Sequence, residues 1–165
     1  MPNWCDNYVV VSNEDKSKID ALEAELSNKE GVGTFQHLCP NPAGEWDYNW
    51  SVDNWGTKWD ASIIDWERQD DNTVWISFET AWSPPIALYD FLVMKGWEVE
   101  AYYHEPGMCF CGKYTNDEGD EFYEYDFSDR GSIEAIPSDI EEFTGLLEYH
   151  DDCKANGDFD EEEVG

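Results

Sequence analysis

The order of strand-like and helix-like segments in this sequence leaves few folds open. Short runs with alternating apolar positions predict strands, and runs with apolar residues every three or four positions predict helices. The strands are expected at Tyr8–Ser12, Ala61–Glu67, Val74–Thr80 and Trp97–Tyr103, and the helices at Glu14–Asn28 and Ile86–Lys95. This order predicts an α+β fold of the ferredoxin-like, split β-α-β type, an antiparallel sheet with two helices on one face.

Local signals mark the ends of both helices. Ser12 or Asn13 can cap the first helix, and Gly31 and Gly33 follow its end. The second helix is preceded by Ser83-Pro84-Pro85 and ends before Gly96. These two helices are therefore expected to pack on one face of the sheet.

Further segments extend this unit. Met108–Tyr114 and Glu121–Phe127 predict an added C-terminal hairpin, and Ser138–His150 predicts a short acidic helix. The stretch 34–60 is rich in Pro, Gly and Trp and is expected to be a loop-rich insertion. We expect one ferredoxin-like domain over residues 1–130, with 131–165 forming a helix and tail on the same domain.

The length and the aromatic content favour a single folded domain. The chain has 165 residues, of which 16% are aromatic, enough to bury a hydrophobic core. Its apolar runs are too short for a membrane span, and no basic segment precedes an apolar one as in a signal peptide. We therefore expect a cytoplasmic protein without membrane contact.

The five cysteines predict reduced thiols. An odd number without a secretory signal is typical of a reducing compartment. Cys109 and Cys111 could join His104, Cys39 or His37 in a zinc site, but the paired Cys-x-x-Cys spacing of zinc ribbons is absent. We expect thiols that pack beside aromatic rings, and neither a metal nor a cofactor.

No catalytic motif is present in the sequence. Neither a Gly-rich phosphate loop nor a Gly-x-Ser-x-Gly motif occurs, and the three histidines lie far apart along the chain. Lys58 stands among Trp55, Trp59 and Asp60, where a cation-π contact is expected rather than a catalytic base. We therefore expect a protein that is not an enzyme.

The acidic tail contains a partial match to an EF-hand calcium loop. The loop would start at Asp152 and carry Lys154 at its third position, where an oxygen ligand belongs. Its candidate calcium ligands are Asp152, Asn156, Asp158, Asp160 and Glu163. Calcium binding is kept as an alternative function.

Four Trp-rich and aromatic motifs carry a family resemblance. They are the opening Met1-Pro2-Asn3-Trp4-Cys5-Asp6-Asn7, then Asn54-Trp55-Gly56-Thr57-Lys58-Trp59-Asp60, Thr80-Ala81-Trp82-Ser83-Pro84-Pro85, and Tyr102-Tyr103 with Glu105-Pro106-Gly107-Met108. Over residues 2–128 the chain resembles the YubB ferredoxin-like domain family, which is encoded on plasmids and in bacteriophage genomes. The resemblance implies a fold and a genomic setting, and it supplies no catalytic residues.

Negative charge is concentrated toward the C-terminus. The formal net charge is −30, and residues 115–165 contain 19 acidic and 2 basic side chains. A globule of this size spans roughly 40 Å, and B-DNA of that length carries on the order of 24 negative charges. The same imbalance also occurs in proteins in which acidity only provides solubility.

The setting implied by the resemblance favours a partner for this charge. We expect an inhibitor or DNA mimic that binds the basic surface of a host defence or nuclease protein and does not bind nucleic acid itself. The predicted partner-binding residues are Asp117, Glu118, Asp120, Glu121, Phe122, Glu124, Tyr125, Asp126, Asp129, Asp139, Glu141 and Glu142. Among them, Phe122 and Tyr125 are expected to be exposed aromatic anchors. The alternative is an assembly module that binds through its Trp-rich surface.

Overall fold

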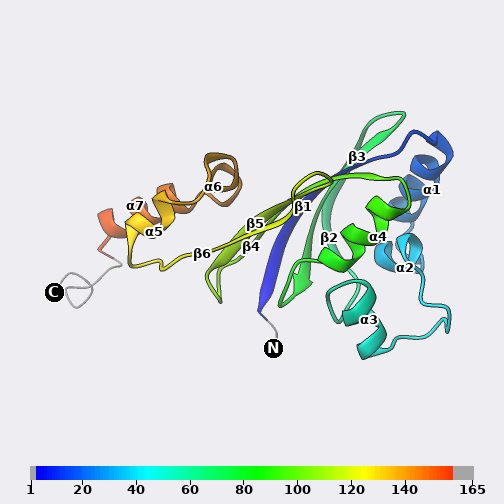
Figure 1. Ribbon diagram of the computed structural model, residues 1–165, viewed down its shortest axis with the longest axis horizontal. Coiled ribbons are helices and arrows are strands. Elements are labelled where there is room, and N and C mark those ends of the chain that lie inside the picture. The colour runs from blue at the N-terminus through cyan, green and yellow to red at the C-terminus, as the bar shows by residue number, and fades with distance from the viewer. Residues whose placement is uncertain (1–2, 158–165) are drawn as a thin grey trace.

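Six strands form one antiparallel sheet in the computed structural model, which describes residues 3–157. The strands are β1 (Trp4–Ser12), β2 (Ser62–Asp70), β3 (Thr73–Ala81), β4 (Glu98–Glu105), β5 (Phe110–Thr115) and β6 (Gly119–Glu124). Their order across the sheet is β2-β3-β1-β4-β5-β6 (Figure 1). The first four strands have the order of a split β-α-β unit, and β5 and β6 extend it as a hairpin.

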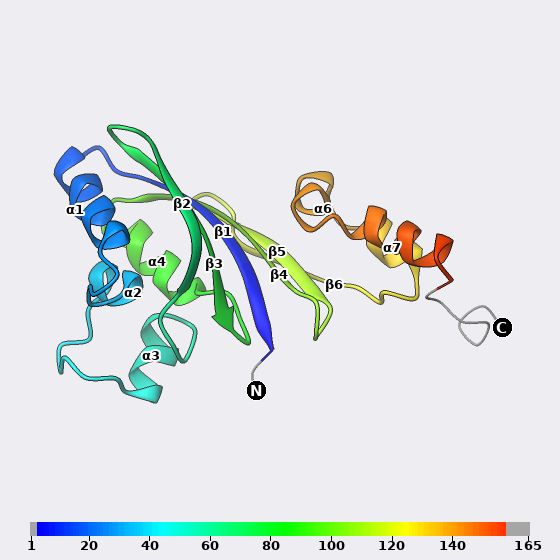
Figure 2. The same ribbon diagram turned by 180° about the vertical axis from the view of Figure 1, so that it is seen from behind.

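The helices lie in two groups. They are α1 (Lys16–Ser27), α2 (Thr34–Leu38), α3 (Tyr48–Asn54), α4 (Ile86–Met94), α5 (Arg130–Glu134), α6 (Ser138–Thr144) and α7 (Leu146–Ala155). Figures 1 and 2 show α1 to α4 on one side of the sheet and α5 to α7 together near its β4-β5-β6 end. The predicted ferredoxin-like α+β fold is therefore confirmed, with α1 and α4 as its two helices.

Alternation along the central strands creates the main core. In β1, Val9 and Val11 are buried, and in β3, Val74, Ile76 and Phe78 are buried. These positions lie on one face of the sheet because successive strand side chains point to opposite faces. Apolar residues of α1 and α4 cover this face: Ile19, Leu22, Leu88 and Leu92. We refer to it as the helix-covered face, and to the other as the open face.

The insertion predicted as loop-rich contains the two short helices α2 and α3. The Asp60 carboxylate accepts hydrogen bonds from the backbone N–H groups of Phe35 (2.8 Å) and Gln36 (3.0 Å), at the start of α2. The buried Trp55 donates its indole N–H to the Cys39 carbonyl at 2.9 Å. At Gly56, where φ is +89°, the backbone passes so close to α4 that a Cβ would lie 3.1 Å from the backbone nitrogens of Ile86 and Ala87.

The C-terminal helices have a small core of their own. Its buried residues are Cys111, Tyr125, Ile133, Ile136, Ile140 and Leu146. Phe143 of α6 stacks on Tyr102 of β4, with ring centroids 5.7 Å apart, so α6 packs on the open face at β4 and β5. The single helix predicted over Ser138–His150 is wrong, because Gly145 adopts a left-handed conformation (φ +65°) and separates α6 from α7.

Candidate protein-binding surfaces

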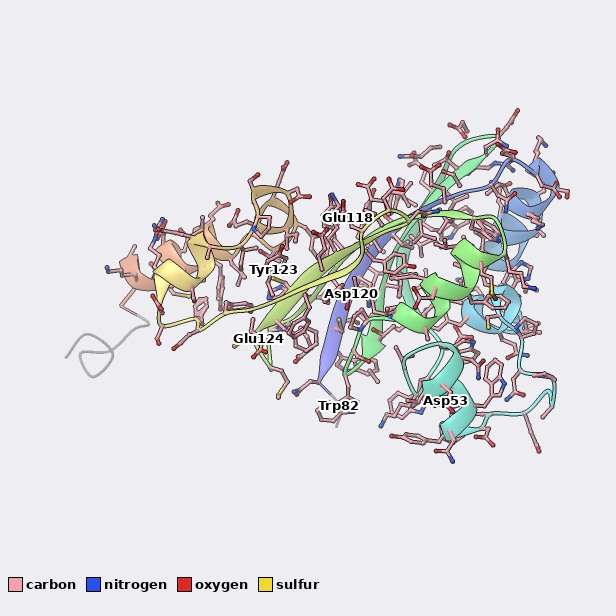
Figure 3. All side chains as sticks on the ribbon, viewed as in Figure 1. Asp53, Trp82, Glu118, Asp120, Tyr123 and Glu124 are labelled. Carbon is pink, nitrogen blue, oxygen red and sulfur yellow. The ribbon has the colours of Figure 1, made fainter. Side chains whose placement is uncertain are left out.

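The β5-β6 hairpin carries half of the predicted partner-binding residues. They lie on β6 and on the turn before it: Asp117, Glu118, Asp120, Glu121, Phe122 and Glu124. β6 is an edge strand of the sheet. The register pairs Asp120 with Tyr114 and Glu124 with Phe110, so both carboxylates, labelled in Figure 3, project on the helix-covered face. Glu121 pairs with Lys113 and projects on the open face. The acidic residues of β6 therefore form two surfaces.

Aromatic contacts hold this hairpin on the sheet. The Phe110 ring lies 6.1 Å from that of Tyr103 and 5.2 Å from that of Phe122. The Tyr103 hydroxyl donates a hydrogen bond to the Asp120 carboxylate at 2.5 Å, and desolvation raises the pKa of that carboxyl group. Phe122 remains 49% exposed at the end of this aromatic row. The charges on β6 are therefore fixed to a rigid strand and flank an exposed ring.

A groove at one end of the sheet gathers carboxylates from separate elements. It has a volume of about 910 Å³ and lies beside the ends of β1, β3, β4 and β5. Its lining includes Glu14 before α1, Glu98 and Glu100 of β4, and Asp117 of the β5-β6 turn. None of the described residues that line it is Lys or Arg. We call it the sheet-end groove.

Two predicted binding residues instead stabilise local turns. The Asp126 carboxylate accepts hydrogen bonds from the backbone N–H and the hydroxyl of Ser128, which hold its pKa below the usual range. Asp129 is the N-cap of α5 and accepts a hydrogen bond from the Gly131 N–H at 3.0 Å. Neutralising either side chain would alter these turns as well as the surface charge.

Asp139 is paired with a cation. Its carboxylate lies 2.7 Å from Lys113 Nζ, which also stands 5.3 Å from the centre of the Tyr102 ring. This hydrogen bond raises the pKa of Lys113 and lowers that of Asp139. The pair links α6 to β5, so Asp139 contributes little free charge to the surface.

Glu141 and Glu142 lie beside a second acidic groove, between α6 and α7. The groove has a volume of about 520 Å³ and is also lined by Glu148, Asp151 and Asp152. Glu141 accepts a hydrogen bond from the Leu147 N–H at 2.8 Å, and Asp151 is paired with Arg130 at 2.9 Å. Two of its five carboxylates are therefore engaged within the fold.

The expectation that Tyr125 is an exposed anchor is wrong. Tyr125 is 8% exposed, because it packs in the C-terminal core with apolar residues of α5 to α7 such as Ile133 and Ile140. Its hydroxyl lies 2.7 Å from His104 Nε2. Burial raises the pKa of Tyr125 and lowers the pKa of His104 to about 4. Phe122 is the exposed aromatic residue of the hairpin.

The Trp-rich motifs divide into a buried and an exposed set. Trp55 is buried and packs against Trp50 and Phe35. The exposed set, which we call the tryptophan surface, contains Trp4 (39%), Trp46 (58%), Trp59 (39%) and Trp82 (47%). Lys58 Nζ lies 4.1 Å from the Trp59 ring centre, and the Trp4 and Trp59 rings are 6.2 Å apart. Lys58 thus makes the expected cation-π contact.

Trp82 holds a backbone conformation that favours glycine. Its φ is +72°, and its N–H donates a hydrogen bond to the Asn3 carbonyl at 2.8 Å. We expect Trp82→Gly to be more stable than Trp82→Ala by about 1 kcal/mol, since alanine retains the left-handed strain that glycine relieves. Urea denaturation of both variants measures this difference. Equal stabilities would show that the strain is absent.

The sequence interpretation overlooked the open face of the sheet. Tyr8 of β1 and Trp75 of β3 stack there with centroids 5.7 Å apart. Asp6 lies directly across from Glu79, and its pKa is raised first by desolvation and then by the charge of Glu79. The signal that could have located this face is the alternation of polar and aromatic residues on alternate positions of β1 and β3.

Metal-ligating side chains do not converge within residues 3–157. No group of three or more His, Cys, Asp or Glu in this range could hold a metal ion, and the five cysteines are free. Asp152 lies within α7 and Asn156 is the residue that caps it. The other three residues of the predicted calcium loop, Asp158, Asp160 and Glu163, lie outside the described residues. Within the described range, no helix is long and apolar enough to cross a membrane.

Comparison with known proteins identifies the family. Residues 58–150, more than half of the chain, match the family described as the ferredoxin-like domain in Api92-like protein. The chain belongs to this family. The Api92-like match contains β2 to β6, with α4, α5 and α6, and so includes the acidic hairpin. It does not confirm the YubB resemblance, whereas it agrees with the fold that the resemblance implied.

One solved protein structure also shows a weak similarity to this chain. The crystal structure of protein Api92 from Yersinia pseudotuberculosis has 22% sequence identity and a TM-score of 0.36, covering 48% of this chain and 30% of that chain. The present chain thus matches less than a third of the Yersinia protein's length. No curated protein matches the sequence.

Proposed function

We propose that this Api92-like protein binds the cationic, nucleic-acid-binding surface of a partner protein and competes with nucleic acid for it. The convergence of Glu14, Glu98, Glu100 and Asp117 on a groove lined by no Lys or Arg carries this proposal. Fixed carboxylates of one sign attract a basic surface, speed its association and discriminate against acidic partners. The proposed partner is a nuclease or defence protein of the host. The resemblance to the YubB family supports this choice, since that family is encoded on plasmids and in bacteriophage genomes.

The positions of the Lys and Arg side chains support an acidic binding surface. Of the nine Lys and Arg, Lys16, Arg68, Lys113 and Arg130 pair with carboxylates. Arg68 pairs with Asp20 and Glu23 of α1, on the helix-covered face. Lys113 is the only Lys or Arg that the described strands place on the open face, and Asp139 neutralises it. Among the described residues, the strands therefore place no unpaired Lys or Arg on the open face, and none lines the sheet-end groove.

Release of proteins from DNA-cellulose tests the proposal. A bacterial lysate is bound to DNA-cellulose, and the purified chain is added at low and at high salt. We expect the chain to release bound proteins at low salt and to lose this ability at high salt, because screening weakens exposed charge interactions. A variant with Glu14→Gln, Glu98→Gln, Glu100→Gln and Asp117→Asn should release about tenfold less protein.

A matched variant controls for net charge. Glu30→Gln, Glu45→Gln, Asp53→Asn and Glu148→Gln remove the same number of charges at exposed positions that do not line the sheet-end groove. This variant should release as much protein as the wild type. Equal release by both variants, or no release by the wild type, would contradict the proposal.

The tryptophan surface supports a second candidate function. Trp4, Trp46, Trp59 and Trp82 are each more than one-third exposed, and large exposed aromatic patches mark protein interfaces. An assembly module that binds there would hold its partner at high salt, since apolar contacts are not screened. Retention of a partner at high salt by the wild type, and its loss in Trp82→Gly, would favour this function over the first.

A further inference from the structure

Half of the backbone groups of β6 face away from the sheet. The Tyr125 N–H donates a hydrogen bond to the Cys109 carbonyl at 3.0 Å, and this pair continues the register that joins β5 to β6. In an antiparallel pair, hydrogen-bonded positions alternate with positions whose N–H and C=O point outward. Glu121 and Tyr123 therefore bond to β5, whereas Asp120, Phe122 and Glu124 direct their N–H and C=O groups to the free edge.

The same three residues present an alternating row of side chains. Asp120, Phe122 and Glu124 project on the helix-covered face, and all three residues are exposed, with the ring of Phe122 at 49%. The Asp120 carboxylate also accepts the hydrogen bond from Tyr103. A charged edge alone would serve to prevent strand pairing. The exposed ring of Phe122 at the centre of the row, packed on Phe110, instead provides an apolar contact for an incoming side chain.

The charges on this edge select the kind of strand that can pair with it. If β6 of a second copy paired antiparallel about Phe122, Asp120 of each copy would lie opposite Glu124 of the other, and like charges directly opposite are destabilising. A strand with Lys or Arg at two alternate positions and an apolar residue between them would place a cation opposite each carboxylate. Charge complementarity thus favours a basic partner over self-association.

We propose that β6 is the docking edge for an extended basic segment of the partner protein, which adds to the sheet as a seventh strand. Strand addition of this kind takes affinity from backbone hydrogen bonds and specificity from alternate side chains. The segment carries Lys or Arg opposite Asp120 and Glu124 and an apolar residue opposite Phe122. This inference rests on the proposed function for the class of partner, and it adds the mode and the sequence pattern of recognition.

A synthetic peptide tests the edge directly. The probe is a ten-residue peptide with arginine, valine and arginine at alternate central positions and threonine elsewhere, added to the ¹⁵N-labelled full chain at low salt. We expect hydrogen exchange of the Asp120, Phe122 and Glu124 amides to slow about tenfold at saturation. The amides of Glu121 and Tyr123, already bonded to β5, are the internal reference. A peptide with glutamate in place of arginine should produce no change.

Two matched variants separate the backbone from the side chain. Phe122→Pro removes the central outward N–H without removing a bond to β5, whereas Phe122→Leu keeps that N–H and an apolar side chain. We expect Phe122→Pro to abolish peptide binding and Phe122→Leu to retain it within about threefold. Unchanged exchange of the Glu121 and Tyr123 amides verifies that the hairpin of each variant is folded.

The outcomes distinguish this inference from the proposed function. Peptide binding without slower exchange of the three outward amides would overturn strand addition, as would equal affinity for the double variant Asp120→Asn/Glu124→Gln. Absence of peptide binding would also overturn it, while release of proteins from DNA-cellulose would still support the proposed function. Slower exchange of the same amides with rising concentration of the chain alone would assign the edge to a second copy and overturn the basic partner.

Discussion

Replacing Asp60 by alanine is expected to destabilise the protein by about 3 kcal/mol. The Asp60 carboxylate accepts hydrogen bonds from the backbone N–H groups of Phe35, Gln36 and Ala61, at 2.8, 3.0 and 2.7 Å. Gly33, the residue before α2, offers no side-chain cap. The variant therefore leaves three donors without their acceptor and releases the contact that joins the insertion to the start of β2.

The consequence of this loss extends to the core. Phe35 is 2% exposed and contacts the rings of Trp55 and Phe78. Urea denaturation followed by tryptophan fluorescence measures the change in the free energy of unfolding. Asp47→Ala is the matched control, since Asp47 caps the exposed start of α3 through the Trp50 N–H alone, and it should cost about 1 kcal/mol. Equal effects of both variants would show that Asp60 acts only as an ordinary cap.

The fold was predictable where local signals and tertiary packing agree. The second helix, expected over Ile86–Lys95, extends over Ile86–Met94, because the prolines before it and Gly96 after it limit its length. The expected strand Val74–Thr80 is part of β3, whose alternate residues are buried. In these segments the apolar residues that predict the helix or strand are the same residues that pack in the core.

Short helices were missed because their stability comes from distant residues. α2 has five residues and α5 has five, too few to form alone in water. The carboxylate that caps α2 belongs to Asp60, more than twenty positions later in the chain. No local pattern could reveal this contact. The insertion was expected to be loop-rich, and the buried Trp55 shows that part of it packs in the core.

The candidate surface was predictable in its charge but not in its geometry. The sequence showed that carboxylates are concentrated after residue 115. Asp117, Glu118 and Glu124 among them lie on one hairpin, whose strand β6 is an edge of the sheet. Composition could not show that Lys113 neutralises Asp139, or that Glu98 and Glu100 of β4 join Asp117 at the sheet-end groove. Such groupings depend on the strand order, which brings β4 between β1 and β5.

His104 is expected to make the protein sensitive to mild acid. Burial holds its pKa at about 4 in the folded protein, below its ordinary value of 6.5. The unfolded chain therefore binds a proton between pH 6.5 and 4 that the folded protein does not bind. Stability falls as the pH decreases through this window and levels off below it, by about 3 kcal/mol in all.

The contact with Tyr125 explains why the neutral form is retained. A neutral His104 can accept a hydrogen bond from the Tyr125 hydroxyl at Nε2, and the two atoms lie 2.7 Å apart. A protonated ring would lose this acceptor and would place a charge at the edge of the C-terminal core. Asp6 lies directly across on β1, and burial nevertheless lowers the pKa of His104.

Comparison of variants isolates this contribution. The free energy of unfolding, measured in urea at intervals from pH 7 to 4, should fall by about 3 kcal/mol more in the wild type than in His104→Gln. His37→Gln replaces a histidine of α2 outside this contact. Its free energy of unfolding should fall between pH 7 and 4 by as much as that of the wild type. If His104→Gln has the same pH profile as the wild type, His104 takes up its proton equally in both states. Acid would then act through the carboxylates alone, and the contact with Tyr125 would have no part in the response.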